Sequence, residues 1–228
     1  MNNRRIWFRL GGVLAAAAVC TGGAAVVSDR AQEAKNVQRA LLGAMETQIQ
    51  IGCYPSETGS PAELTERERT ELQTAYASRV ERYYTEENPC RKRYIALNED
   101  FLTACDSDVE YSESGGVADC RFDSVRLYAD RMTAVVQAQT VVWDKRISGN
   151  PEQGFSVELP VNRDTITATM KKENGVWKLD SIDSQISLSA AVSADDEVCR
   201  ERYPTFETAR QAADSIDDQA YIKEARFA

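Results

Sequence analysis

MTAVVQAQTVVWDK, residues 132–145, is the stretch that decides the fold of this chain. Apolar or small side chains recur at every second position in most of it, and Thr133, Gln137 and Gln139 lie between them. This period of two is typical of a β-strand that buries one of its faces. We therefore predict a half-buried strand whose inward side chains are Met132, Ala134, Val136, Ala138, Thr140 and Val142.

Three more strands are predicted around it, at residues 120–128, 165–170 and 176–182. The turn signals Ala129-Asp130 and Glu173-Asn174-Gly175 separate neighbouring strands by only a few residues. Strands joined by such short turns pair in antiparallel order, so we expect a meander. Residues 147–154 are predicted to form a longer connection between two long strands.

Helical periodicity comes before and after these strands. The spacing of Val37, Leu41, Met45 and Ile49 predicts a helix over residues 30–51. Ser60-Pro61-Ala62-Glu63 resembles a capping box that starts a second helix, ending near Glu87, and a third, shorter helix is expected to end near Cys105. A last helix is predicted over residues 204–225, with a thin apolar face made of Ala209, Ala213, Ile216 and Ala220.

Helices followed by an antiparallel sheet define the α+β class, here with N-terminal helices packed on a curved, cone-like sheet. Three segments are expected: a signal peptide or signal anchor at 1–29, the α+β domain at 30–185, and a C-terminal tail with a helix at 186–228. The first segment carries Arg4, Arg5 and Arg9 before the uncharged run LGGVLAAAAVCTGGAAVV, residues 10–27. This pattern predicts export, either as a cleaved secreted protein or as a single-pass membrane protein, with the bulk of the chain outside the cytoplasm in both cases.

Composition narrows the chemistry. The chain contains no histidine, which excludes Ser-His-Asp and Cys-His nucleophile pairs and zinc sites that need imidazole. Its 27 basic and 36 acidic residues give a net charge of −9, which argues against a nucleic-acid partner. We expect no cofactor and no bound metal.

The strands at 132–183 resemble the nuclear-transport-factor-two-like superfamily. The resemblance rests on the strand MTAVVQAQTVVWDK, the return strand RDTITATM at 163–170, and the hairpin NGVWKLDSID at 174–183. Extracytoplasmic branches are the most similar: proteins associated with mammalian-cell-entry transporters, type IV secretion scaffold domains, and the accessory domain of secreted amidases. The amidase branch carries a catalytic half with Cys and His, which this chain lacks.

The resemblance implies a pocket inside the cone, and the residues that could line it are Tyr128, Trp143, Asp164 and Trp177. The alternative is that these side chains belong to the core and the sheet surface. Two functions follow. We favour a non-catalytic, membrane-tethered or secreted module that docks envelope or membrane proteins. The other reading is a small-molecule or lipid-binding cone, or a carboxylate-dependent isomerase or hydrolase with Asp164 as base.

The cysteines are expected to pair if the chain is exported. The preferred bridge joins Cys105 to Cys120, and Cys199 would then join Cys90 or Cys53, with Cys90 preferred. Cys53 and Cys90 are not expected to pair with each other, because they flank the second helix. Reduced, buried cysteines are the alternative.

Overall fold

The computed structural model describes residues 29–53, 64–103, 109–191 and 197–226. A helix over residues 29–49, called helix 29–49 below, is followed by a short 3₁₀ turn, two helices, five strands and three short helices. The elements after helix 29–49 are η1 (Gln50–Gly52), α2 (Glu66–Tyr83), α3 (Pro89–Thr103), β1 (Val109–Leu127), β2 (Thr133–Asn150), β3 (Gly154–Glu158), β4 (Pro160–Glu173), β5 (Val176–Ala191), α4 (Glu197–Arg200), α5 (Phe206–Asp214) and α6 (Asp218–Ala225). The predicted α+β class is confirmed.

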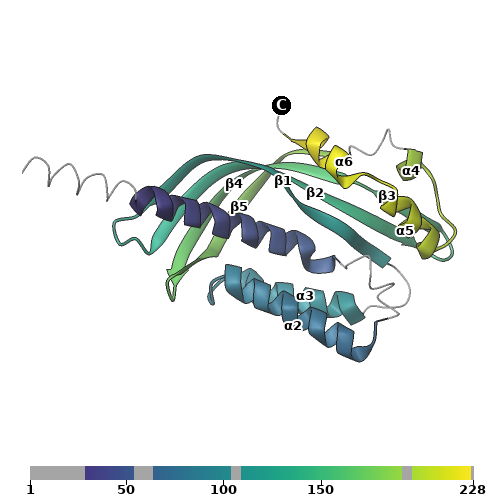
Figure 1. The fold of residues 1–228 in the computed structure, drawn as a ribbon, viewed down its shortest axis with the longest axis horizontal. Helices are drawn as coiled ribbons and strands as arrows, with labels where there is room; N and C mark the ends of the chain where they lie inside the picture. The colour runs from purple at the N-terminus through teal and green to yellow at the C-terminus, as the bar shows by residue number, and fades with distance from the viewer. Residues whose placement is uncertain (1–28, 54–63, 104–108, 192–196, 227–228) are drawn as a thin grey trace, which may run out of the picture.

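The strands form one antiparallel sheet in the order β1-β2-β4-β5, with β3 paired to the far end of β2. The sheet is curved and open, and it arches over helix 29–49 (Figure 1). The prediction for residues 147–154 was wrong, because β2 continues to Asn150 and turns directly into β3. The Asn150 carboxamide oxygen accepts the backbone N–H groups of Glu152 and Gln153, which closes this turn locally.

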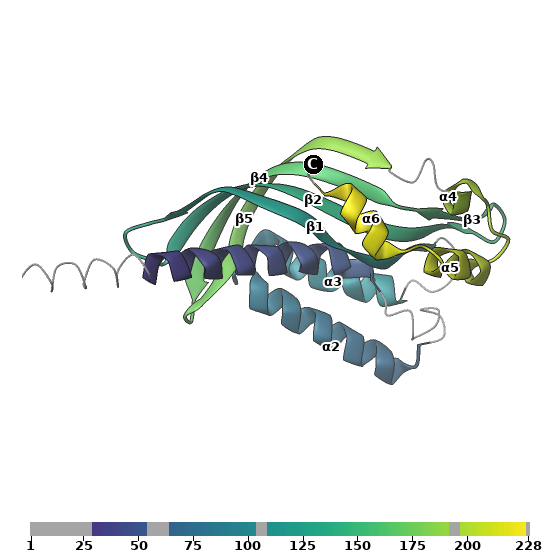
Figure 2. The ribbon, with the colours of Figure 1, turned by 45° about the horizontal axis from the view of Figure 1, so that its top comes forward.

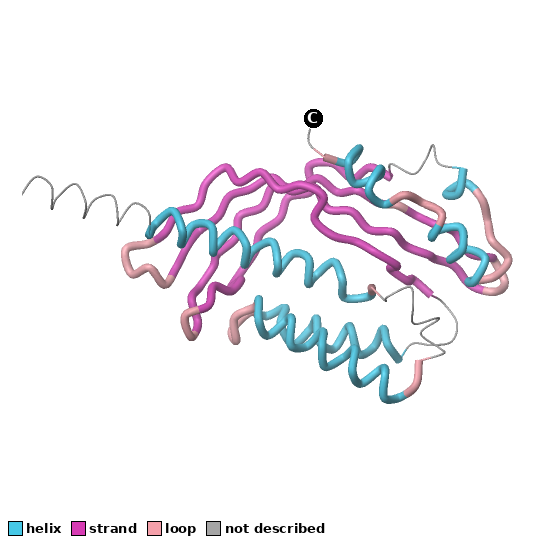
Figure 3. Tube along the Cα trace, viewed as in Figure 1, coloured by secondary structure: helices cyan, strands magenta, loops and turns pink. Residues whose placement is uncertain are grey.

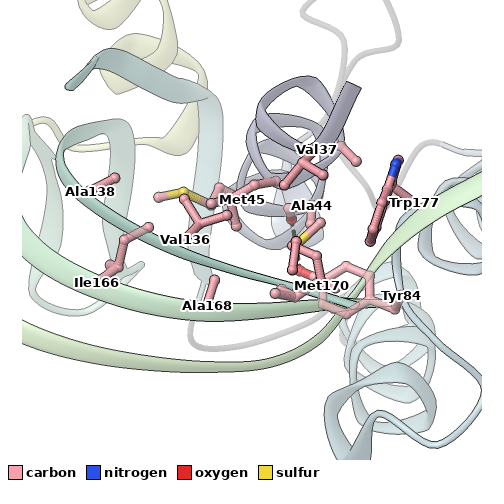
Figure 4. Packing of buried hydrophobic residues seen from close by; sticks show 14 of the residues in the cluster. Val37, Ala44, Met45, Tyr84, Val136, Ala138, Ile166, Ala168, Met170 and Trp177 are labelled. Atoms are coloured by element: carbon pink, nitrogen blue, oxygen red, sulfur yellow. Dashed lines mark hydrogen bonds between the residues drawn. The ribbon is translucent and has the colours of Figure 1, made fainter. Parts of the chain in front are cut away.

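Helix 29–49 fills the concave side of the sheet. Val37, Leu41 and Ala44 have no exposed surface, and they pack against the buried face of the strands. Figure 4 shows Val136, Ala138, Ile166, Ala168 and Met170 beneath the helix. Burial of each Val, Leu, Ile or Met side chain in this layer contributes about 1.5–3 kcal/mol relative to an exposed one. The layer between helix and sheet is therefore a packed core.

The helices α2 and α3 cover the other side of helix 29–49, away from the sheet (Figures 1 and 3). Tyr84, which caps α2, donates its hydroxyl to the carbonyl oxygen of Ala44 at 2.7 Å. A Cβ added to Gly43 would lie 2.3 Å from the ring of Tyr83, so a larger residue there would have to displace that ring. The capping box of α2 is built by Thr65 and Glu68; the predicted start at Ser60 lies outside the described residues.

The long strand β2 changes its buried face halfway. Ala134, Val136 and Ala138 point toward helix 29–49, whereas Val141, Trp143 and later odd-numbered residues are buried on the opposite face. The predicted inward set was wrong only at Met132, which is 47% exposed because it precedes the strand in the β1–β2 turn. Thr140 is fully buried, and Val142 is half-buried against the same core as Ala134, Val136 and Ala138.

The C-terminal helices cover that second face, at the end of the sheet away from the start of helix 29–49 (Figure 2). The predicted single helix over 204–225 was wrong, because α5 ends at Asp214 and Asp217 caps the separate helix α6. Ala209 and Ala213 are fully buried against β2 and β3, and the ring of Tyr221 packs edge-on to Trp143 with 6.0 Å between centroids.

Candidate functional site

The four predicted pocket residues lie in different surroundings. Trp143 packs against Tyr221 on the face that α6 covers. Asp164 pairs with Thr140 on β2, three positions from Trp143, and an odd spacing along a strand places the two side chains on opposite faces. Asp164 accepts a hydrogen bond from Ser184 at 3.2 Å, and burial raises the pKa of its carboxyl. These two residues do not share a pocket.

Trp177 and Tyr128 lie at the other end of the sheet. The indole N–H of Trp177 donates to Glu33 on helix 29–49 at 2.6 Å, and its ring is buried. Tyr128 lies in the β1–β2 turn and is 46% exposed. Each borders a different hollow, and Glu33 borders both hollows. The structure therefore brings two of the four residues to one end of the molecule.

One hollow at this end has a volume of about 550 Å³ and lies between helix 29–49 and the end of β1. The other, of about 370 Å³, lies between helix 29–49, α2 and the β4–β5 turn. Six cationic side chains line the two hollows together, against the single carboxylate of Glu33. We call these six residues the basic end: Arg30, Arg39, Arg82, Arg126, Arg131 and Lys172.

Only part of the positive charge at the basic end is neutralised. Glu33 pairs with Lys172 at 2.8 Å, and Lys172 and Trp177 together hold the pKa of Glu33 below its ordinary value. Arg131 pairs with Asp29 at 2.6 Å. The remaining four arginines form no ion pair within the described residues. The basic end therefore keeps a local positive charge in a chain whose net charge is −9.

A buried cluster of charges, which the sequence analysis missed, lies between the sheet and the C-terminal helices. Lys145 on β2 is 4% exposed, and its Nζ contacts Asp218 Oδ1 at 2.9 Å and Glu113 Oε2 at 3.3 Å. It also donates to the carbonyl oxygen of Ala213 at 3.1 Å. A signal was present in the sequence, because Lys145 shares the alternation of Val141, Trp143 and Ile147.

Glu113 is the titratable member of this cluster. It lies at a β-bulge of β1, between Ser112 and Ser114 in the pairing with β2. Burial raises the pKa of Glu113 to about 7; the positive charge of Lys145 opposes this rise, and the nearby carboxylate of Asp214 adds to it. Glu113 also borders an open hollow of about 380 Å³ whose lining includes Gln50, Cys53 and Arg79. No group of three or more potential metal ligands gathers within the described residues.

The predicted disulfide bonds are not formed among the described cysteines. Cys53, Cys90, Cys120 and Cys199 are free thiols, and Cys105 lies outside the described residues. Cys90 packs at the core under helix 29–49, whereas Cys199 lies on α4 and packs against the core between the sheet and the C-terminal helices. The two thiols are held in separate cores, so the Cys90–Cys199 pairing was wrong. Burial raises the pKa of Cys53 and of Cys120 to about 12, which leaves both thiols protonated at neutral pH.

Within the described residues no helix is long and apolar enough to cross a membrane; the predicted anchor at residues 10–27 lies outside them. Comparison with known proteins found no match to a family model, to a curated protein or to a solved structure.

Proposed function

We propose that this chain is a non-catalytic binding module of the cell envelope, tethered by its N-terminal segment, whose domain lies outside the cytoplasm and docks other envelope proteins. Membership of the nuclear-transport-factor-two-like superfamily is part of the same proposal, and the curved α+β fold is compatible with it. The main support is the filled concave side of the sheet, where a ligand of a cone-shaped fold would bind. Helix 29–49 occupies that space with fully buried side chains.

A surface for docking is available on the opposite side of the sheet. Near the β1–β2 turn, the outer face carries exposed polar side chains in register across neighbouring strands, with Gln137 beside Thr167 and Thr167 beside Asp183. The C-terminal helices cover only the other part of this face, against Val141 and Trp143. An open, polar, multi-stranded face suits a partner that binds by hydrogen bonds as well as by shape.

Site-specific photo-crosslinking in cells tests this docking surface. A photoreactive residue at Gln137 or Thr167 is expected to form adducts with an extracytoplasmic or membrane protein, whereas the same residue at exposed Glu71 on α2 is the matched control. Adducts that form equally from all three positions, or only with cytoplasmic proteins, would contradict the proposal.

The location is tested independently with a phosphatase that is active only outside the cytoplasm. Fused after Ala228, it is expected to be active, because the arginines before residues 10–27 keep the N-terminus on the cytoplasmic side. An inactive but stable fusion would refute the proposed orientation. The purified chain is also expected to hydrolyse neither peptides nor esters, since no nucleophile has a histidine base.

One observation favours a second candidate function, the binding or conversion of a small molecule. The hollow of about 380 Å³ is bordered by Glu113, a carboxyl whose pKa is raised to about 7. Such a carboxyl group suits acid–base chemistry, although the ammonium of Lys145, 3.3 Å away, would compete with a ligand for contact with it. A turnover abolished by Glu113→Gln and retained in Asp164→Asn would establish this function in place of the docking module.

A further inference from the structure

We propose that the basic end of the domain rests on the surface of an anionic phospholipid bilayer, the bilayer that holds the N-terminal segment. This inference depends on the tether in the proposed function and adds an orientation and a lipid class to it. It is carried by three independent features of the described residues: exposed apolar side chains, unpaired arginines, and the position at which the chain enters the domain.

The exposed apolar side chains gather at this end. The described residues include four large apolar side chains that are exposed, and three of them lie in or directly after the two turns at this end. Tyr128 and Met132 belong to the β1–β2 turn, and Val176 follows the β4–β5 turn, with exposures of 46%, 47% and 49%. Figures 1 and 2 both place the β1–β2 turn beside the first described turn of helix 29–49, and the β4–β5 turn at the same end of the sheet. Isolated exposed apolar residues are ordinary, but a group at one tip is typical of a contact surface.

Arginines surround these apolar side chains. The guanidinium of Arg126 lies 5.7 Å from the centre of the Tyr128 ring, and Arg30 and Arg131 line the same hollow. The described acidic residues beside them do not pair with Arg30 or Arg126. Asp29 pairs with Arg131, and Asp130 accepts hydrogen bonds from the backbone N–H groups of Met132 and Thr133. Arginine side chains bind phosphate oxygens, and exposed Tyr and Met side chains can enter the headgroup region beside them. This combination fits an anionic lipid surface.

The N-terminal path of the chain indicates which bilayer the basic end would contact. The apolar run at 10–27 ends two residues before helix 29–49, so a membrane that takes up this run lies next to Asp29 and Arg30. Salt bridges join the β1–β2 turn and the end of β4 to the same helix, through Arg131 to Asp29 and through Lys172 to Glu33. The two turns are therefore held at the level where the chain would leave the bilayer. The net charge of −9 would repel the rest of the domain from anionic lipid. This repulsion favours an orientation in which the basic end faces the bilayer.

The test uses the full chain reconstituted in vesicles that contain a phospholipid with a photoactivatable headgroup. One set of vesicles is phosphatidylcholine alone and the other contains phosphatidylglycerol as well; labelled peptides are mapped by mass spectrometry. We expect labelling at Tyr128, Met132 and Val176 in the anionic vesicles, and weaker labelling in the neutral ones and at high salt. Arg126→Gln is expected to reduce labelling of the turns about fivefold, which corresponds to the roughly 1 kcal/mol that one basic residue contributes near an anionic surface.

Two further variants sharpen the result. Met132→Ser removes an exposed apolar contact and is also expected to reduce labelling of the turns, and Arg67→Gln on the exposed start of α2 is the matched control that leaves labelling unchanged. Labelling confined to residues 10–27 would overturn the inference while the tether stands. Equal labelling of the turns in both vesicle types would overturn the anionic preference. A chain that stays in the supernatant without any label would overturn the tether and the inference together.

Discussion

The buried carboxyl of Glu113 predicts how stability depends on pH. Its pKa rises from the ordinary 4.5 to about 7 in the folded chain, mainly because burial penalises the charged form. Between these two values the unfolded chain releases a proton that the folded chain retains. Ionisation therefore stabilises the unfolded state, and the free energy of unfolding falls as pH rises from about 4.5 to about 7.

The magnitude follows from the two pKa values. Their difference of about 2.5 corresponds to an upper limit of about 3–4 kcal/mol, at about 1.4 kcal/mol for each pH unit. The variant Glu113→Gln keeps the size of the side chain and stays neutral at every pH. Near pH 4.5 it is expected to match the parent chain. Above pH 7 it is expected to be more stable by up to about 3–4 kcal/mol, because only the parent carries the buried charge.

Urea unfolding followed by circular dichroism at about pH 4.5 and about pH 8 measures this difference. The comparison of variant with parent isolates Glu113 from other titrating groups, which are common to both proteins. Glu71→Gln is the control, since Glu71 is exposed and pairs only with Arg67 on the surface of α2. An advantage of Glu113→Gln that does not grow with pH, or a parent chain that gains stability over the variant at pH 8, would refute the reasoning.

Three further predictions concern stability and the thiols. Leu41→Ala removes a fully buried side chain beneath the sheet and is expected to cost about 2–5 kcal/mol in urea unfolding, whereas Leu97→Ala at an exposed position of α3 is expected to cost under about 1 kcal/mol. Thr65→Ala removes the side-chain cap of α2 and is expected to cost about 1 kcal/mol, a loss that Thr65→Ser should largely avoid. Iodoacetamide at neutral pH is expected to modify the partly buried thiols of Cys53 and Cys120 slowly in the folded chain and rapidly in urea, because burial raises the pKa of both. A crosslink found by non-reducing peptide mapping among Cys53, Cys90, Cys120 and Cys199 would contradict the structure.

Periodicity in the sequence was sufficient for the type and order of most elements. The four-residue spacing of Val37, Leu41 and Met45 predicted the helix that fills the sheet, and these residues are buried there. Alternation at Ala134, Val136 and Ala138 predicted the strand that receives it. These signals are local, because a residue's place on a helix face or strand face depends only on its position along that element. The α+β class followed from them directly.

The tertiary structure decided what each face packs against. The switch at Val141 depends on where helix 29–49 ends and where the C-terminal helices cover the sheet. The same arrangement buries Lys145 and Glu113, and it holds Cys90 and Cys199 in separate cores.

The basic end also required the fold. Arg30, Arg82, Arg126 and Lys172 are far apart in the chain and share no motif. The net charge predicted an acidic molecule, but composition contains no information about where basic residues gather in the fold. Alternation and spacing in the sequence predict whether a side chain is buried or exposed, but they do not identify its neighbours, which come from distant segments. Only the packing of those segments brings the basic residues of this end together.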